Sequence, residues 1–244
     1  MKMKNNFWKC VGSVALCGMF CVVFAYAVSD YSPWTSTVTG MNNIKYHGRT
    51  GITASNGMVS STATILTTDS TKVPAKYVKA YAELYRGIAL ASYGGPVENG
   101  ALSTGITATT GKASGQGTYT AHGTTWYKGS DGAMKTLELE SVDYYMAVRA
   151  NGGVDLTTEE KQIHTNADGG TYGEAMVVKY LNEDVDMISA IGKNGTEGYI
   201  KTSDLPHNIP DYVPHDHDIP VYASDGVTVI DSFFISSGYT DTVE

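Results

Sequence analysis

Residues 215–218, His-Asp-His-Asp, have the types and spacing best suited to metal chemistry in this chain. In an extended segment, side chains two residues apart point the same way, so His215 and His217 could share one divalent metal ion, with Asp216 or Asp218 adding an oxygen ligand. Zinc usually has three or four protein ligands on a rigid frame, whereas this stretch lies between two prolines in a predicted linker. We expect a solvated polar loop and keep a divalent metal site as the alternative.

Four aromatic residues are the candidates for ligand binding: Trp34, Trp126, Tyr127 and Tyr199. The first three could form a stacking platform for sugars, and Tyr199 lies near the middle of a predicted strand. Such residues more often pack in a core or on the face of a sheet, and we favour packing in this Tyr-rich chain. Ligand binding by these side chains is the alternative.

The chain contains no G-x-S-x-G, S-x-x-K or H-E-x-x-H motif of a known catalytic type. His47, His122 and Ser92 could join an aspartate in a triad assembled from distant positions, but nothing in the sequence supports this. The turns at Asp168 and Asp225 do not match a calcium loop, whose ligands alternate over twelve residues and end on a glutamate. We therefore predict no catalytic residues and no cofactor apart from the metal alternative.

The first 27 residues have the pattern of a secretory signal peptide. A start with three lysines precedes an apolar run over residues 11–24 and then Ala-Tyr-Ala, the small-x-small pattern that signal peptidase accepts. The run is short for a membrane span, which takes about 20 residues. We predict export with cleavage after Ala27, and a retained anchor or a lipoprotein is the alternative.

All three cysteines, Cys10, Cys17 and Cys21, lie in this first segment. Lipid attachment needs a small residue before the cysteine, and Leu16 and Phe20 do not fit. After cleavage the chain has no cysteine, which excludes disulfides, a thiol nucleophile and cysteine-bound zinc. The rest of the 244-residue chain is long enough to build its own core. We expect a secreted or envelope-associated protein with no membrane contact after cleavage.

Charge divides the chain in two. Residues 28–148 carry 9 Lys and Arg against 8 Asp and Glu, whereas residues 149–244 carry 5 against 17. This change predicts a boundary near residues 151–153, between a domain at 33–150 and a smaller acidic module at 151–238. Nucleic acid is disfavoured as a partner, because phosphate binding depends on clustered Lys and Arg.

The run "KYVKAYAELYR" at residues 76–86 alternates strictly. Its small and aliphatic side chains fall on one face, and its Tyr, Lys and Glu side chains fall on the other. This period of two predicts a strand, and Arg86-Gly87 turns it into a second strand at residues 88–93. Asn56-Gly57 and residues 129–132 predict further hairpin turns. We therefore expect a mainly β chain whose first domain is an antiparallel β-sandwich.

The second part is predicted to be a small α+β module with β-hairpins. Short helices are expected between residues 154 and 191, where Ala175, Val178 and Leu181 have helical spacing. Asn194-Gly195 and residues 224–226 predict two hairpins. Four of the seven prolines predict an extended linker at residues 206–220.

Three runs in this part, "TNADGGTYGEA", "VDMISAIGKNGTEGYIKTSDLP" and "IPVYASDGVTVIDSFFI", resemble the C-terminal region of exported β-rich proteins of Gram-positive bacteria. Those proteins carry motifs like TYGxA, GTxGYVxxxDL and IPLYDxDGxTVIGxF. "VPAKYVKAYAELYR" is similar to a strand of related exported proteins. The resemblance covers residues 73–93 and 165–235, and departs at Val185-Asp186 and Asp231-Ser232. It implies export and assigns no activity.

The run "GTEGYIKTSDL" also resembles the closing strand of bacterial SH3-like wall-binding domains. Together these features predict an exported, non-catalytic protein that acts by binding at the cell envelope or outside the cell. Its partner would be a protein or a cell-wall glycan. A secreted wall-active hydrolase with a site assembled across strands is the first alternative. A bacteriocin-like exported toxin is the second.

Overall fold

The computed structural model describes residues 28–146 and 162–240. Over these residues the chain is mainly β, with two sheets and one α-helix, α1 (Ala175–Leu181). The 3-10 helices of this part are η1 (Met41–Asn43), η2 (Thr202–Asp204) and η3 (Pro206–Asn208). The predicted signal peptide and the predicted boundary near residues 151–153 lie outside the described residues.

The first sheet has the order β1-β3-β4-β7-β18, with β2 paired to β3 and β8 paired to β4. Asn56-Gly57 joins β3 to β4 in a hairpin closed by Ser55 and Met58, which confirms the predicted turn. Both turn residues have the positive φ that a tight hairpin requires. The strands are β1 (Val28–Tyr31), β2 (Val38–Thr39), β3 (Lys45–Ser55), β4 (Met58–Thr67), β7 (Gly105–Thr109), β8 (Ala113–Ser114) and β18 (Tyr239–Thr240).

The second sheet has the order β10-β9-β5-β6-β17-β16-β15-β14-β13-β12, with β11 paired to β9. The hairpins predicted at Arg86-Gly87, residues 129–132, Asn194-Gly195 and residues 224–226 are all present. The strands are β5 (Val78–Arg86), β6 (Ala89–Glu98), β9 (Gly117–Lys128), β10 (Met134–Glu138), β11 (Val142–Met146), β12 (His164–Thr165), β13 (Thr171–Gly173), β14 (Met187–Ile191), β15 (Glu197–Lys201), β16 (His217–Tyr222) and β17 (Val229–Ser236).

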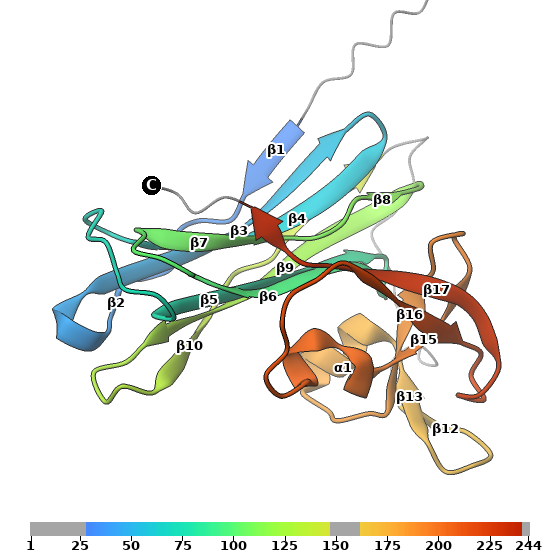
Figure 1. Ribbon diagram of the computed structural model, residues 1–244. Coiled ribbons are helices and arrows are strands. Elements are labelled where there is room, and N and C mark those ends of the chain that lie inside the picture. Colours follow the sequence, from blue (N-terminus) through green and yellow to red (C-terminus); the bar gives the residue numbers. More distant parts are fainter. Residues whose placement is uncertain (1–27, 147–161, 241–244) are drawn as a thin grey trace, which may run out of the picture.

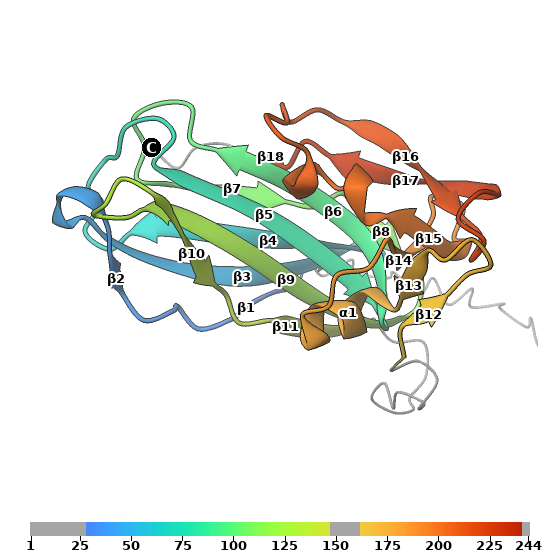
Figure 2. The same cartoon turned by 90° about the horizontal axis from the view of Figure 1, so that it is seen from below.

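β6 pairs with strands of both parts of the chain. On one side it pairs with β5, and on the other it pairs in parallel with β17 through Tyr93 and with β14 through Leu90. The strands β6, β17, β16, β15 and β14 therefore close into a five-stranded barrel. We call residues 162–236 the C-terminal module. It lies beside the β5–β6 layer, while the first sheet covers the opposite side of that layer (Figures 1 and 2).

The two faces of β5 are both largely buried. Val78, Ala80 and Leu84 pack toward the first sheet, as the alternation predicts. The opposite face carries Tyr81 and Glu83, and the C-terminal module packs over it. The residue types on this face are typical of a solvent-exposed surface. The face is nevertheless buried, because the C-terminal module, which includes Lys179 at 96 residues after Glu83, covers it.

The C-terminal module contains less helix than the sequence predicts. The predicted helix with Ala175 and Val178 on its buried face is α1, while Leu181 is exposed. The helical prediction nearest residue 154 falls outside the described residues. The predicted linker at 206–220 is partly regular structure, because Pro206 is buried in η3 and β16 begins at His217.

Candidate functional site

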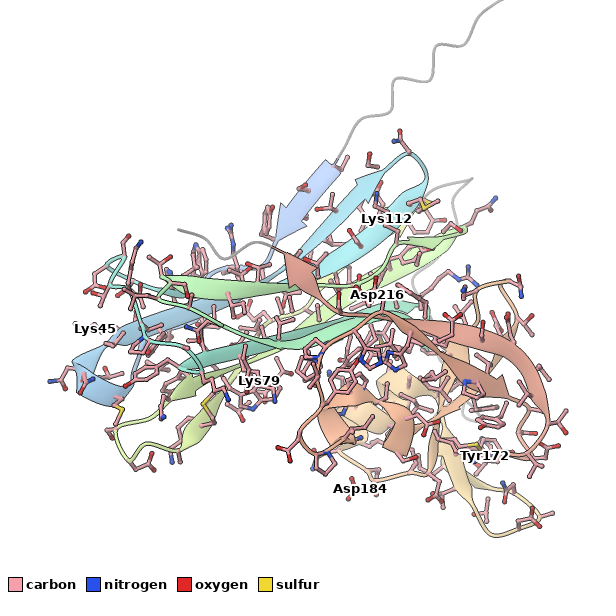
Figure 3. The ribbon with its side chains drawn as sticks, viewed as in Figure 1. Lys45, Lys79, Lys112, Tyr172, Asp184 and Asp216 are labelled. Atoms are coloured by element: carbon pink, nitrogen blue, oxygen red, sulfur yellow. The ribbon has the colours of Figure 1, made fainter. Side chains whose placement is uncertain are left out.

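A groove with a volume of about 780 Å³ lies between the open end of the β5–β6 hairpin, opposite its turn, and η3 with the segment that follows it. Lys79 and Glu98 lie on one wall, and His207, Asp211 and Tyr212 lie on the other. Figure 3 shows Lys79 on the side of the sheet that faces the C-terminal module. A volume of this size suits a small ligand or several units of a chain. Cationic, anionic and aromatic groups therefore meet in one concavity.

The groove is backed by a cluster of aromatic rings. The His207 ring stacks on Tyr81 with centroids 5.2 Å apart, and its Nδ1 lies 3.0 Å from the Tyr93 hydroxyl. Tyr81 contacts Trp126 at 5.4 Å and Tyr93 at 5.5 Å between ring centroids. These rings meet because β9, β5 and β6 are neighbours in the sheet and present them on the same face. The cluster fixes the position of the groove wall at His207.

A buried ion pair lies behind this cluster. Glu83 of β5 pairs with Lys179 of α1, and only 7% of the Glu83 side chain is exposed. Burial opposes the charged form of Glu83, but the neighbouring Lys179 outweighs it and lowers the pKa of the carboxyl. Burial likewise opposes the charge of Lys179, and Glu83 outweighs it and raises the pKa of the amine. Both groups remain ionised and engaged with each other, which favours a structural role.

Two histidines border the ion pair. His122 of β9 lies opposite Glu83 in the sheet register. Burial lowers the pKa of His122 below its ordinary 6.5, helped by the positive charge of Lys179. Desolvation by the side chains around it also lowers the pKa of His207, although this residue is exposed at the groove. Both histidines are therefore neutral in the folded protein at pH values where they are protonated in the unfolded chain.

This difference makes stability depend on pH. A lowered folded-state pKa contributes stability that is complete above the unfolded value of 6.5 and is lost as the pH falls toward the folded value. We expect the thermal midpoint to decrease between pH 7.5 and pH 5, and the His122→Gln variant to show a shallower decrease. Melts at half-unit pH intervals measure both slopes. Equal slopes in His122→Gln and in the control His164→Gln would contradict this prediction.

The four residues predicted to bind ligand lie in separate places. Trp126 and Tyr127 are adjacent on β9 and point to opposite faces, Trp126 toward Tyr81 and Tyr127 toward Tyr46 of β3. Tyr199 lies in a different hollow of about 520 Å³ on the C-terminal module. Trp126 is thus the member of the four beside the groove wall.

Trp34 lies in the connection between β1 and β2, where it packs against β3 of the first sheet, away from the groove. Its ring stacks on His47 with centroids 4.0 Å apart, and the guanidinium carbon of Arg49 lies 4.3 Å from the centroid of the same ring. His47 and Arg49 are two residues apart on β3 and share a face. The stacked imidazole covers one face of the indole, so the guanidinium takes the other. A ligand stacking on Trp34 would have to displace one of them.

The structure divides the side chains of residues 215–218 among different partners. Asp216 accepts a hydrogen bond from the backbone N–H of Ser237 at 2.7 Å, and Asp218 pairs with Lys193 at 2.9 Å. The rings of His215 and His217 stack on each other with centroids 4.5 Å apart. Over the described residues, no group of three or more His, Cys, Asp or Glu side chains is arranged to hold a metal ion.

Sequence reasoning missed the groove and its backing. His207 and Tyr212 lie in the segment interpreted as a linker, and Lys179 lies on a short helix with no motif around it. One indication was present in the sequence: Glu83 interrupts the aromatic face of β5 between Tyr81 and Tyr85. A carboxylate among aromatic residues on a strand requires a buried partner if that face is covered.

Comparison of the chain with known proteins finds no match among protein-family models, curated proteins or solved structures. None of the helices in the described part of the chain has the length and apolar character needed to cross a membrane. The function is therefore inferred from the geometry of the groove.

Proposed function

We propose that this chain is an exported, non-catalytic binding protein that holds a cell-wall glycan in the groove. The observation that carries the proposal is the combination of Tyr212, His207 and Lys79 around one open concavity of about 780 Å³. In this proposal the two facing sheets form an antiparallel β-sandwich that acts as a rigid scaffold, and the C-terminal module closes one side of the site.

A glycan suits the groove because a sugar ring has an apolar face and a rim of hydroxyl groups. The half-buried ring of Tyr212 lines the groove and offers a surface for the apolar face. Lys79 and Glu98 can hydrogen-bond to the rim as a donor and an acceptor. The Lys79 ammonium lies 5.6 Å from the centroid of the Trp126 ring, which helps to hold the amine at the groove wall.

Export is the second part of the proposal, and the sequence supports it. The lysine-led apolar start of the chain has the pattern of a signal peptide. The resemblance of residues 165–235 to exported proteins of Gram-positive bacteria points to the same location. A wall glycan is the polymer that such a protein meets first, which is why we place it ahead of a protein partner.

The test is cosedimentation of the full chain, in mild detergent, with insoluble wall prepared from a Gram-positive bacterium. We expect the Tyr212→Ala variant to bind about tenfold more weakly, because loss of one aromatic contact is worth about 1–1.5 kcal/mol. Tyr180→Ala is the matched control, since Tyr180 is 88% exposed on α1 and lies outside the groove. Equal binding by both variants, or no binding by the wild type, would overturn the proposal.

A wall-active hydrolase is the second candidate, and one observation favours it. His207 has a lowered pKa, reaches the groove and contacts the Tyr93 hydroxyl at 3.0 Å through Nδ1. In the tautomer whose Nδ1–H donates to that hydroxyl, the neutral imidazole offers Nε2 as a base. Soluble reducing ends released from the same wall preparation separate the two functions. Release that disappears in His207→Ala favours the hydrolase, and binding without release favours the binding protein.

A further inference from the structure

The rings of His215 and His217 form a stacked pair at the surface beside the groove. Their centroids are 4.5 Å apart and their planes differ by 25°. The residues alternate along an extended segment, so both side chains leave the backbone on the same side. Tyr212 packs against the His215 ring at 5.6 Å and lies within hydrogen-bond reach of the His215 carbonyl at 3.3 Å. The pair is held by neighbouring side chains and by its own backbone.

The hydrogen bonds of the two rings define which nitrogen carries the proton. Nδ1 of His215 lies 2.8 Å from the carbonyl oxygen of Val213, and Nδ1 of His217 lies 3.0 Å from the carbonyl oxygen of His215. A carbonyl oxygen can only accept. The Tyr212 hydroxyl, 3.4 Å from Nδ1 of His217, donates its own hydrogen to the His215 carbonyl, so each Nδ1 is the protonated, donating nitrogen. Each neutral ring then has an unprotonated Nε2. This is the arrangement found around metal-ligating histidines, whose second nitrogen usually donates to a carbonyl or carboxylate.

The separation of the rings matches that of two ligands of one ion. Metal–nitrogen bonds of about 2.0–2.1 Å place the centroids of two adjacent imidazole ligands roughly 4.5–5 Å apart, and the observed separation is 4.5 Å. The near-parallel planes must turn toward each other for both lone pairs to meet at one point. The two aspartates of the motif pair with Ser237 and Lys193, and no group of three or more ligating side chains is arranged around one point in the described residues, so the proposed set is the two histidines.

We propose that His215 and His217 form a two-histidine site for a first-row transition-metal ion, with Cu²⁺ bound more tightly than Ni²⁺ or Zn²⁺. Imidazole nitrogen suits these ions, and for a given set of ligands Cu²⁺ binds most tightly. Two protein ligands leave the other coordination positions to water. The proposed metal ligands do not line the glycan groove, although Tyr212 of the groove packs against the His215 ring.

Histidine ring resonances in NMR spectra of the full chain test the site without any substitution. The three cysteines are first alkylated, because free thiolates also bind these ions. Paramagnetic Cu²⁺ added to one equivalent is expected to broaden the resonances of His215 and His217 before those of the other four histidines. Broadening that begins elsewhere, or equally at all six, would overturn the proposal.

Calorimetric titration with Cu²⁺ provides the second measurement. We expect His215→Ala and His217→Ala each to weaken binding at least tenfold, and the double variant to lose one bound equivalent. His164→Ala removes a histidine from β12 and is expected to keep that equivalent. Equal stoichiometry in the double variant and the wild type would contradict a two-histidine site. Zn²⁺ binding more tightly than Cu²⁺ would contradict the proposed order of affinity.

Discussion

Replacing Lys179 with methionine is expected to lower the free energy of unfolding by about 3 kcal/mol or more, because it leaves the buried Glu83 carboxylate without its partner. Only 7% of the Glu83 side chain is exposed, so water cannot replace the ammonium. The loss should be largest near neutral pH. Without Lys179, burial raises the pKa of Glu83, so protonation at lower pH removes part of the penalty. Urea unfolding at pH 7.5 and pH 5 measures both effects.

A double variant separates charge burial from packing. Glu83→Gln combined with Lys179→Met removes both charges, and we expect it to recover at least half of the stability that the single Lys179→Met variant loses. Glu83→Gln alone should cost less than Lys179→Met, since one third of the Lys179 side chain is exposed and its charge can reach water. If the double variant is as unstable as Lys179→Met, the ion pair is not the cause.

Gly94→Ala is expected to reduce stability by several kcal/mol or to prevent folding. A Cβ at this position would lie closer than 3.0 Å to main-chain atoms of Thr109 and Thr110. Main-chain atoms cannot move aside as a flexible side chain can, so β6 would have to separate from β7. Overpacking of this kind typically costs about 1–3 kcal/mol, and a clash with backbone exceeds the usual case. Circular dichroism and urea unfolding measure the loss.

Gly100→Ala is the matched control, because no atom of the described residues lies within 4 Å of the point that its Cβ would occupy, and its φ is not in the left-handed region. We expect its stability to stay within about 0.5 kcal/mol of the wild type. A Gly94→Ala protein as stable as Gly100→Ala would show that β6 and β7 are not in close contact. This contact between β6 and β7 affects the groove, because β6 carries Tyr93, which belongs to the aromatic cluster.

The Glu83–Lys179 ion pair and the close contact of Gly94 with β7 both hold the groove in place. Lys179 ties α1 to β5, while β6 connects the first part of the chain to the barrel. Since His207 rests on Tyr81 and Tyr93, the groove wall belongs to the same core as these contacts. A ligand would therefore meet a preformed surface, which reduces the entropic cost of binding.

The sequence by itself determined most of the strands and hairpins. Alternation in residues 78–86 and the dipeptides Asn56-Gly57 and Asn194-Gly195 act over a few residues, because backbone sterics and turn geometry are local. The helix at Ala175–Leu181 followed from the same kind of spacing. The opposite orientations of Trp126 and Tyr127 could also be predicted from the sequence, since neighbouring residues on a strand face opposite sides of the sheet.

The tertiary structure alone decided which polar face is buried and where the groove lies. The partners Glu83 and Lys179 are 96 residues apart, and Tyr93 and His207 are 114 residues apart. No local pattern encodes such distances. The closure of β6 with β14 and β17 into a barrel brings these residues together, and it depends on parallel pairings whose partners are set by the packing of whole strands.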